Sequence, residues 1–408
     1  MNAPAASSRL PPALWALLAV VFINMVGFGV VVPLLPFFAR SMDALEWQIT
    51  LLFSAYSLGQ FFAEPFWGRL SDRIGRKRVL MVTVATNVVG YVALAFAPNV
   101  WVAIVIRLFT GLGAGNISTV QGYIADVTPP HERAGRMGLV GAAFGIGFIV
   151  GPALGGLLSH PSDGRLGYQL PLFVAAALAA ISATGVQLFV KESRVHAPPP
   201  PSPWRSVGDA RAHPVISRVL LVSLIYMGGF SGMESSFALW AENRFDWGAR
   251  EVGLCFMVVG IVSAASQALI TGRLARRFGE ARVLAFGVLA FGASLVVQTV
   301  LPVSWLVPVV MAIGALGMSL AMPNISAMIS HSSPAGRQGS MLGLNMAAGS
   351  GARIVGPIVA GFTFTYLGPD WPFWTGAALT VPAAIVAARA GRALARWRGE
   401  QLAAAPAG

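Results

Sequence analysis

Apolar runs dominate the chain, and short clusters of charged and turn-forming residues separate them. Each run is roughly 18–25 residues long, the length that a helix needs to cross a hydrocarbon core of about 30 Å. The runs stay apolar throughout and do not alternate over about 10 residues, as the strands of a membrane β-barrel do. We therefore predict an all-α polytopic membrane protein with twelve transmembrane helices, at residues 14–38, 48–68, 79–97, 100–125, 137–159, 169–190, 215–241, 250–271, 282–300, 304–329, 339–364 and 371–389.

The composition supports this fold class. Hydrophobic residues make up 56% of the 408 residues, charged residues make up 11%, and the mean hydropathy is +0.70. Soluble domains carry about 25% charged residues, so a soluble enzyme is excluded. The single cysteine, Cys255, excludes an internal disulfide and a cysteine-based metal cluster. The five histidines show no metal-ligand spacing, and we expect no metal and no cofactor.

The distribution of positive charge predicts the orientation. Most of the 28 Lys and Arg residues fall in the segments that precede the first span, follow the last, or join the spans on that same side. Cytoplasmic loops of membrane proteins concentrate Lys and Arg, so both termini are predicted to be cytoplasmic. The net charge of +12 is thereby explained without nucleic acid. The first apolar run, 14–38, is too long for the core of a cleavable signal peptide. An Ala-, Arg- and Gly-rich chain further suggests a bacterial inner membrane.

The chain also repeats itself. The sequence of residues 68–75, GRLSDRIG, returns as GRLARRFG at residues 272–279, and both copies continue to Arg-Val-Leu shortly afterwards. A second match pairs Gly151-Pro152 with Gly356-Pro357 at nearly the same offset. We infer a duplicated six-helix unit.

The duplication predicts the domain organisation. An N-terminal half spans residues 1–190 and a C-terminal half spans 214–408, with a cytoplasmic linker at 191–213 between them. The run Pro198–Pro201 in this linker is typical of a semi-rigid spacer, and a structureless stretch of this length marks a natural boundary between the halves.

Two parallel six-helix halves are the arrangement of major facilitator transporters. Over its whole length the chain resembles the twelve-span drug:proton antiporters of that family, the tetracycline and multidrug efflux group. Four elements carry the resemblance: the loop at residues 68–77 between helices 2 and 3; Arg107 with Gly111 and Gly113 in helix 4; the helix 5 antiporter signature with Gly141, Gly145, Gly151, Pro152, Gly155 and Gly156; and the Pro-x-x-Pro element at residues 32–36.

The resemblance implies a conformational gate in the loop between helices 2 and 3, at Gly68, Asp72, Arg73, Gly75 and Arg76. Asp72 would hold the two halves together, by facing a helix N-terminus or by pairing with an arginine; an ordinary helix cap is the alternative. Glu64 shares a helix face with Gly68 and Asp72 and is expected to form a salt bridge at this gate, with drug contact as the alternative. The glycines of helix 5 would let helices approach closely and slide.

Four ionisable residues fall inside the predicted spans: Glu64, Arg107, Glu234 and Arg353. Such residues are costly in a bilayer and usually mark ion or proton pathways. A rise of about 1.5 Å per residue places the last three at one level, just beyond the membrane centre.

Glu234 is the leading candidate for the protonation site, because a carboxyl that alternates between an apolar surround and an arginine would load and release a proton. Arg353 is a possible partner of Glu234, and the resemblance assigns Arg107 to proton transfer. A static ion pair, and an Arg107 that only satisfies helix carbonyls, are the alternatives.

The resemblance also implies a substrate cavity lined by helices 1, 4, 7 and 10, which supply Asn24, Phe28, Asn116, Gln121, Tyr226, Phe230, Phe237, Trp240, Met322 and Asn324. Aromatic residues and methionine suit an adaptable apolar pocket. The tetracycline exporters typically have an aspartate in helix 1, where this chain has Asn24.

We therefore expect a monomeric secondary transporter that exports small amphipathic drugs in exchange for protons, drawing on the proton gradient. The chain has no Gly-x-x-x-x-Gly-Lys-Ser/Thr sequence, so ATP hydrolysis through a P-loop is not expected. A proton-coupled importer or facilitator of a polar nutrient is the main alternative. A sensor or scaffold on the same fold is a third reading.

Overall fold

The computed structural model describes residues 12–129, 132–160, 162, 164–193, 203–333 and 337–403. Within these residues the regular secondary structure is helical, which confirms the predicted fold class. The helices are α1 (Pro12–Arg40), α2 (Glu46–Ile74), α3 (Arg76–Ala95), α4 (Val100–Gly113), α5 (Ile117–Val127), α6 (Arg133–Leu157), α7 (Gln169–Phe189), α8 (Pro203–Ala212), α9 (Pro214–Phe245), α10 (Ala249–Ser266), α11 (Gly272–Phe278), α12 (Glu280–Val300), α13 (Val307–Ser332), α14 (Gln338–Leu367) and α15 (Trp371–Ala403).

Each predicted span corresponds to one helix or to two consecutive helices. The fourth span consists of α4 and α5. The eighth consists of α10 and a π-helical turn at Gln267–Thr271, and the helix continues beyond the predicted span as α11. Ten of the described helical segments are long and apolar enough to cross a membrane. The two remaining spans, α2 and α14, are as long, at 29 and 30 residues, but carry more polar side chains. Several of those polar side chains, among them Gln60, Glu64 and Asn345, face the inside of the molecule.

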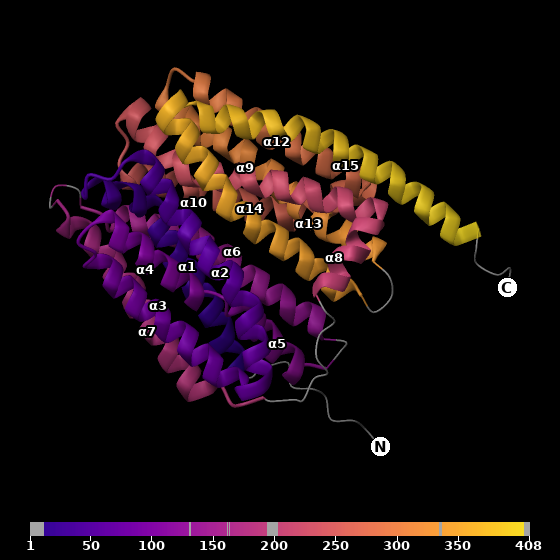
Figure 1. The fold of residues 1–408 in the computed structure, drawn as a ribbon, viewed down its shortest axis with the longest axis horizontal. Helices are drawn as coiled ribbons and strands as arrows, with labels where there is room; N and C mark the ends of the chain where they lie inside the picture. The colour runs from indigo at the N-terminus through magenta and orange to yellow at the C-terminus, as the bar shows by residue number, and fades with distance from the viewer. Residues whose placement is uncertain are drawn as a thin grey trace.

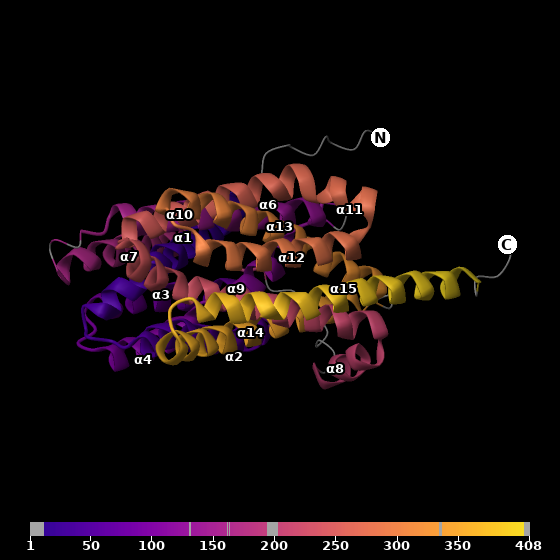
Figure 2. The ribbon, with the colours of Figure 1, turned by 90° about the horizontal axis from the view of Figure 1, so that it is seen from above.

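The helices form two groups that lie side by side (Figure 1). Helices α1 to α7 make up the first group, and α8 to α15 make up the second. We call the end at which α1 begins and α15 ends the near end, and the end at which α1 finishes and α15 begins the far end. Figure 2 shows α15 running along the outside of the second group and projecting past its neighbours at the near end.

The segment between the groups is partly helical, where the sequence suggested a structureless spacer. Helix α8 occupies most of the second half of the predicted linker 191–213. Its Ala210 is buried, and its Asp209 forms an ion pair with Arg337 at the beginning of α14. The helix forms because it packs on the second group. The predicted spacer Pro198–Pro201 lies outside the described residues.

The two groups touch each other at the far end. The hydroxyl of Ser54 on α2 donates to the backbone carbonyl of Ile354 on α14 at 2.8 Å. Arg40, at the end of α1, lies 3.1 Å from the carboxylate of Glu242 on α9. Since these contacts join helices of different groups, they close the far end.

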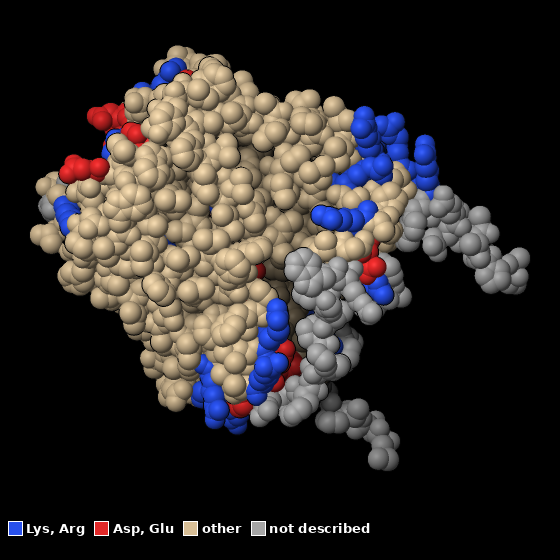
Figure 3. All heavy atoms as spheres, viewed as in Figure 1, with Lys and Arg blue, Asp and Glu red and all other residues tan. Residues whose placement is uncertain are grey.

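The near end is open. A Cβ atom added to Gly141 or Gly145 on α6, or to Gly343 or Gly351 on α14, would meet no other heavy atom of the described residues within 4 Å. These positions lie on the near-end halves of α6 and α14, which pack against α10 and α2 of the other group. Figure 3 shows a hollow between the groups on this side of the molecule. The fold therefore holds a cavity that is closed at one end and accessible from the other.

Candidate functional site

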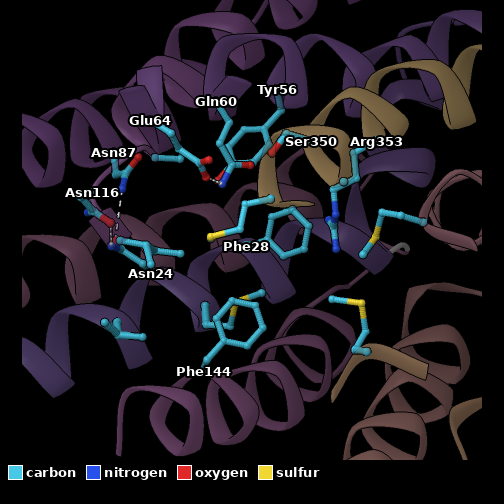
Figure 4. Close-up of a pocket in the computed structure, with 18 of the residues that line it drawn as sticks. Asn24, Phe28, Tyr56, Gln60, Glu64, Asn87, Asn116, Phe144, Ser350 and Arg353 are labelled. Carbon is cyan, nitrogen blue, oxygen red and sulfur yellow. Dashed lines mark hydrogen bonds between the residues drawn. The ribbon is translucent and has the colours of Figure 1, made fainter. Parts of the chain in front are cut away.

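A cavity of about 260 Å³ lies between the two groups and takes side chains from both (Figure 4). Helices of both groups contribute to it, and its apolar lining includes aromatic rings and methionines. The lining residues are Val21, Asn24, Met25, Phe28, Tyr56, Gln60, Glu64, Asn87, Tyr91, Ala114, Asn116, Ile117, Phe144, Ser223, Met227, Met322, Asn345, Met346, Gly349, Ser350 and Arg353. A cavity of mostly apolar character with a few polar groups is typical of a small-molecule site.

Three asparagines form a chain of hydrogen bonds along one wall of the cavity. Asn87 of α3 donates to Asn24 of α1 at 3.2 Å, and Asn24 donates to Asn116 at 3.0 Å. Asn116 lies in the break between α4 and α5, where its backbone N–H donates to the backbone carbonyl of Ala114. The break therefore turns a polar side chain of the fourth span toward α1.

Glu64 faces the cavity from α2. Its carboxylate accepts a hydrogen bond from Gln60 at 3.0 Å, one helical turn earlier on the same face. The sequence suggested a salt bridge at the gate for Glu64, and here its recorded partner is Gln60 in the cavity wall. The helix geometry explains the difference. Asp72 lies eight residues after Glu64, which turns its direction by about 80° and places it about 12 Å further along the helix, so the two carboxylates face different surroundings.

Glu234 and Arg353 form an ion pair at the opposite wall, within the second group. The Arg353 Nη1 atom lies 3.6 Å from Glu234 Oε2. Glu234 is 4% exposed and its Oε1 atom has no hydrogen-bond partner among the described residues. Arg353 lines the cavity and its guanidinium lies 5.7 Å from the centre of the Phe230 ring. Arg353 is therefore the arginine that pairs with Glu234, and it connects this buried carboxyl to the cavity.

Arg107 belongs to the first group and lies behind the cavity wall. It is 2% exposed, and its guanidinium carbon lies 4.2 Å from the centre of the Tyr56 ring. Its Nε atom donates to the carbonyl of Leu52 at 3.4 Å. Tyr56 lines the cavity, so Arg107 contacts the site through this ring, while Glu234 takes a different arginine as its partner.

The predicted gate loop is organised around Arg76, which is buried. The Arg76 guanidinium lies 2.6 Å from Asp72, one turn before it, and 3.2 Å from Asp126 at the end of α5. It also donates to the Ser71 hydroxyl at 2.6 Å, and the Arg76 backbone N–H donates to Glu192 at 2.7 Å. Asp72 thus pairs with an arginine, one of the two arrangements expected, and it does so within its own group.

The remaining residues of this loop have separate surroundings. Gly75 adopts φ 107°, a conformation that favours glycine, and a Cβ atom there would meet the carboxylate of Glu192. Gly68 faces the side chain of Ser118, and Arg73 is exposed.

The glycines of the predicted antiporter helix divide into two sets along α6. Gly151 packs against Gly29 of α1, Gly155 packs against Val30 of α1, and Gly156 packs against Ala249 of α10 in the other group. Pro152 lies between them and contacts Gly29 as well. Gly141 and Gly145, nearer the open end, have no such neighbour among the described residues. Of the predicted antiporter residues, only those on the far half of this helix make close backbone contacts in this structure.

Of the ten substrate residues expected from the sequence, the structure brings four to the cavity: Asn24, Phe28, Asn116 and Met322. The other six lie elsewhere in the molecule, namely Gln121, Tyr226, Phe230, Phe237, Trp240 and Asn324. Apart from Gln121 on α5, they are buried inside the second group. The reason is that the far half of α9 packs into the closed end, where Trp240 donates to Asp370 at 2.7 Å. Asn324 donates back to its own helix, at Leu320.

Sequence reasoning missed several residues of the cavity, above all on α2, α3 and α14. They include Tyr56, Gln60, Asn87, Tyr91, Phe144, Asn345 and Ser350. One signal was available in the sequence. An amide such as Gln60, Asn87 or Asn345 within an apolar span has to face the inside of the bundle, because lipid offers it no hydrogen bond.

The sequence of the chain matches a known protein family. The family model described as Major Facilitator Superfamily matches residues 17–280 and 235–406. The chain therefore belongs to this superfamily of membrane transporters.

Its relatives within the superfamily point to one group. The chain is 30% identical to the tetracycline resistance protein, class C, of Escherichia coli, over 88% of this chain and 91% of that protein. It is 32% identical to the class G protein of Vibrio anguillarum, over 86% and 89% of the two chains. The quinolone resistance protein NorA of Staphylococcus aureus is 25% identical, over 84% and 88%. These findings confirm the resemblance to the tetracycline and multidrug efflux group.

Solved structures agree with the fold. A bacterial homologue of the human lysosomal transporter Spinster, described as inward-facing and occupied, superposes with a TM-score of 0.79. The two share 16% sequence identity, and the match covers 93% of this chain and 96% of the other.

Proposed function

We propose that the protein exports small amphipathic drugs in exchange for protons, as a monomer in a bacterial inner membrane. The observation that carries the proposal is the Glu234–Arg353 pair, a buried carboxyl that meets the drug-sized cavity through its arginine. The relatives named for tetracycline, quinolone and multidrug resistance support efflux over nutrient import.

The charge distribution supports an orientation. Lys and Arg gather at the near end, along the right and lower edges of Figure 3, while Asp and Glu are prominent at the far edge. By the positive-inside rule the near end faces the cytoplasm. The structure is then open to the cytoplasm, the state in which an exporter takes up its substrate.

The cavity offers chemistry for an amphipathic molecule. Phe28, Phe144 and the methionines supply a soft apolar surface. The carboxylate of Glu64 attracts positive charge on a substrate, because in this wall its recorded partner is the neutral amide of Gln60. Arg107 positions Tyr56 by stacking on its ring.

Proton coupling follows because the Glu234 carboxyl can bind either Arg353 or a proton. In the cytoplasm-open state a deprotonated Glu234 binds Arg353, and the contact between the two is loose, at 3.6 Å. When the cavity opens outward, a proton from outside neutralises Glu234, and the carboxyl no longer holds the arginine. Return to the inward state restores the pair and expels the proton.

The two predicted halves, residues 1–190 and 214–408, rock about the central cavity in this cycle, with residues 191–213 joining them. The Arg76 cluster keeps the near end of the first half rigid, because one guanidinium ties α2, α3 and α5 together. The close contact of Gly156 and Pro152 on α6 with α10 provides the surface along which the halves move.

The proposal is tested in proteoliposomes loaded with acid and containing the purified protein. Addition of tetracycline or ethidium is expected to release protons from the vesicles, and sugars are expected to have no effect. Alkalinisation of the medium by a sugar would indicate symport and replace the exporter proposal. Vesicles with an inactive protein of equal density serve as the control.

A further inference from the structure

Two buried side-chain amide atoms in the cavity, one from each half, lack a hydrogen-bond partner among the described residues. They are the Nδ2 atom of Asn116 and the Oδ1 atom of Asn345. Asn116 is 1% exposed and Asn345 is 7% exposed, and both line the cavity. Buried polar groups are nearly always satisfied, so each of these atoms calls for an explanation.

The orientation of Asn116 is fixed by its neighbours. Asn24 donates to the Asn116 oxygen, and Asn24 in turn accepts from Asn87. In this chain each asparagine donates its amino group to the side-chain oxygen of the next. Asn116 is the last member, so its own amino group has no acceptor among the described residues. Figure 4 shows these asparagines together on one side of the cavity, across from Arg353. The wall of the first half therefore presents an oriented hydrogen-bond donor that carries no charge.

Asn345 supplies the complementary group from the second half. It lies on α14 two turns before Arg353, and its unsatisfied atom is an acceptor. Leaving such groups unmet costs desolvation free energy, which a ligand with matching groups recovers.

We propose that Asn116 and Asn345 form a subsite that recognises uncharged hydrogen-bonding groups of the exported molecule. A carbonyl or enol oxygen of the ligand would accept from Asn116, and a hydroxyl or amide of the ligand would donate to Asn345. The preferred substrates are then ring compounds that carry carbonyl, hydroxyl or carboxamide groups, rather than purely lipophilic cations. This inference rests on the proposed drug export, and it adds the class of drug.

The test compares two probes that bind an aromatic cavity but differ in these groups. Tetracycline carries carbonyl, hydroxyl and carboxamide groups, whereas tetraphenylphosphonium is an aromatic cation with no hydrogen-bonding group. Equilibrium binding of each is measured by isothermal titration calorimetry on purified protein in nanodiscs, without a proton gradient. Asn345→Leu is expected to weaken tetracycline binding about 3- to 10-fold, the worth of one uncharged hydrogen bond, and to leave tetraphenylphosphonium binding within about twofold.

A second variant keeps the proposal testable if Asn345→Leu fails to fold. Asn116→Asp removes the donor but keeps an oxygen for Asn24, and it is expected to weaken the binding of tetracycline while tetraphenylphosphonium, a cation, binds as well or better. Met341→Leu, an apolar exchange of similar volume on the same helix but in the core outside the cavity, is the matched control and should leave both probes unchanged.

Unchanged tetracycline binding, or equal weakening of both probes, would overturn the subsite. Because no proton gradient is present, that result would leave proton-coupled export standing. Wild-type protein that binds both probes but moves no protons would overturn the proposed function alone.

Discussion

At the scale of single residues, the proposed coupling depends on a carboxyl that is separated from the cavity by its own counter-ion. Glu234 is almost fully buried, while the side chain of Arg353 is 28% exposed and lines the cavity. A substrate or water molecule in the cavity therefore meets the arginine first. In the proposed mechanism, a molecule in the cavity can therefore influence the protonation of Glu234 through Arg353.

Removing the counter-ion tests this arrangement. Arg353→Ala is expected to leave Glu234 protonated throughout the cycle, because an uncompensated buried charge costs several kcal/mol. Uphill drug transport should fall at least about tenfold, equivalent to 1.4 kcal/mol. Arg353→Lys keeps the charge and should retain part of the activity. Uptake into inverted membrane vesicles measures both, and normal uphill transport by Arg353→Ala would exclude a role in coupling.

The residues of the site were only partly predictable from the sequence. The four ionisable residues inside the spans could be found because charge in a bilayer is rare, and three of them, Glu64, Glu234 and Arg353, do lie in or beside the cavity. The aromatic residues of α9 could not be sorted, since Phe237 in the core and Phe28 in the cavity are equally apolar. Which face of a helix meets the cavity depends on packing between the halves.

At the scale of helices, the sequence predicts the elements well. Apolar length alone located every span, because a helix must be about 20 residues long to cross the membrane. The breaks within spans and the short helix between the halves were harder to predict from the sequence. The break between α4 and α5 follows a Gly-rich stretch of sequence. That stretch shows neither where the helix ends nor that the break turns Asn116 toward Asn24. Helix α8 was missed because its stability comes from packing on α9 and α14.

The two sets of glycines on α6 lead to a prediction about conformational change. Gly145 has free space in this structure, whereas Gly156 packs on the backbone of α10. Gly145→Val should therefore fit the present state and hinder closure of the near end, which traps the protein open to the cytoplasm. Gly156→Val should disrupt the closed far end instead and favour the outward-open state.

Distances between spin labels on α2 and α14 at the near end measure this balance. The two valine variants are expected to shift the distance distribution in opposite directions, and each is the control for the other. Equal distributions in both variants would show that α6 does not form the moving contact.

At the scale of the whole molecule, the far end is held by polar contacts between the halves. Arg40 of the first half lies between Glu46 of its own half, at 3.5 Å, and Glu242 of the second, at 3.1 Å. These side chains are partly exposed, so their attraction is screened by solvent and salt.

The variant Glu242→Gln is expected to weaken closure of the far end modestly. Partly exposed ion pairs contribute about 0.2–1 kcal/mol, so the outward-open population should rise by at most about fivefold. The same label distances report this shift, and high salt should produce a similar change in the wild-type protein. A Glu242→Gln distribution identical to wild type at low salt would show that this pair does not influence the equilibrium.

The exchange of drug for proton at Glu234 is tested most directly by Glu234→Gln in proteoliposomes. The glutamine keeps the shape of the side chain but takes up no proton. We expect this variant to lose proton-driven accumulation of tetracycline while it still exchanges labelled for unlabelled drug without a gradient. Glu64→Gln, which alters a carboxylate of the cavity wall, should keep the coupling and weaken the binding of cationic drugs. Wild-type proton release by the Glu234→Gln variant would contradict the assignment of the proton site.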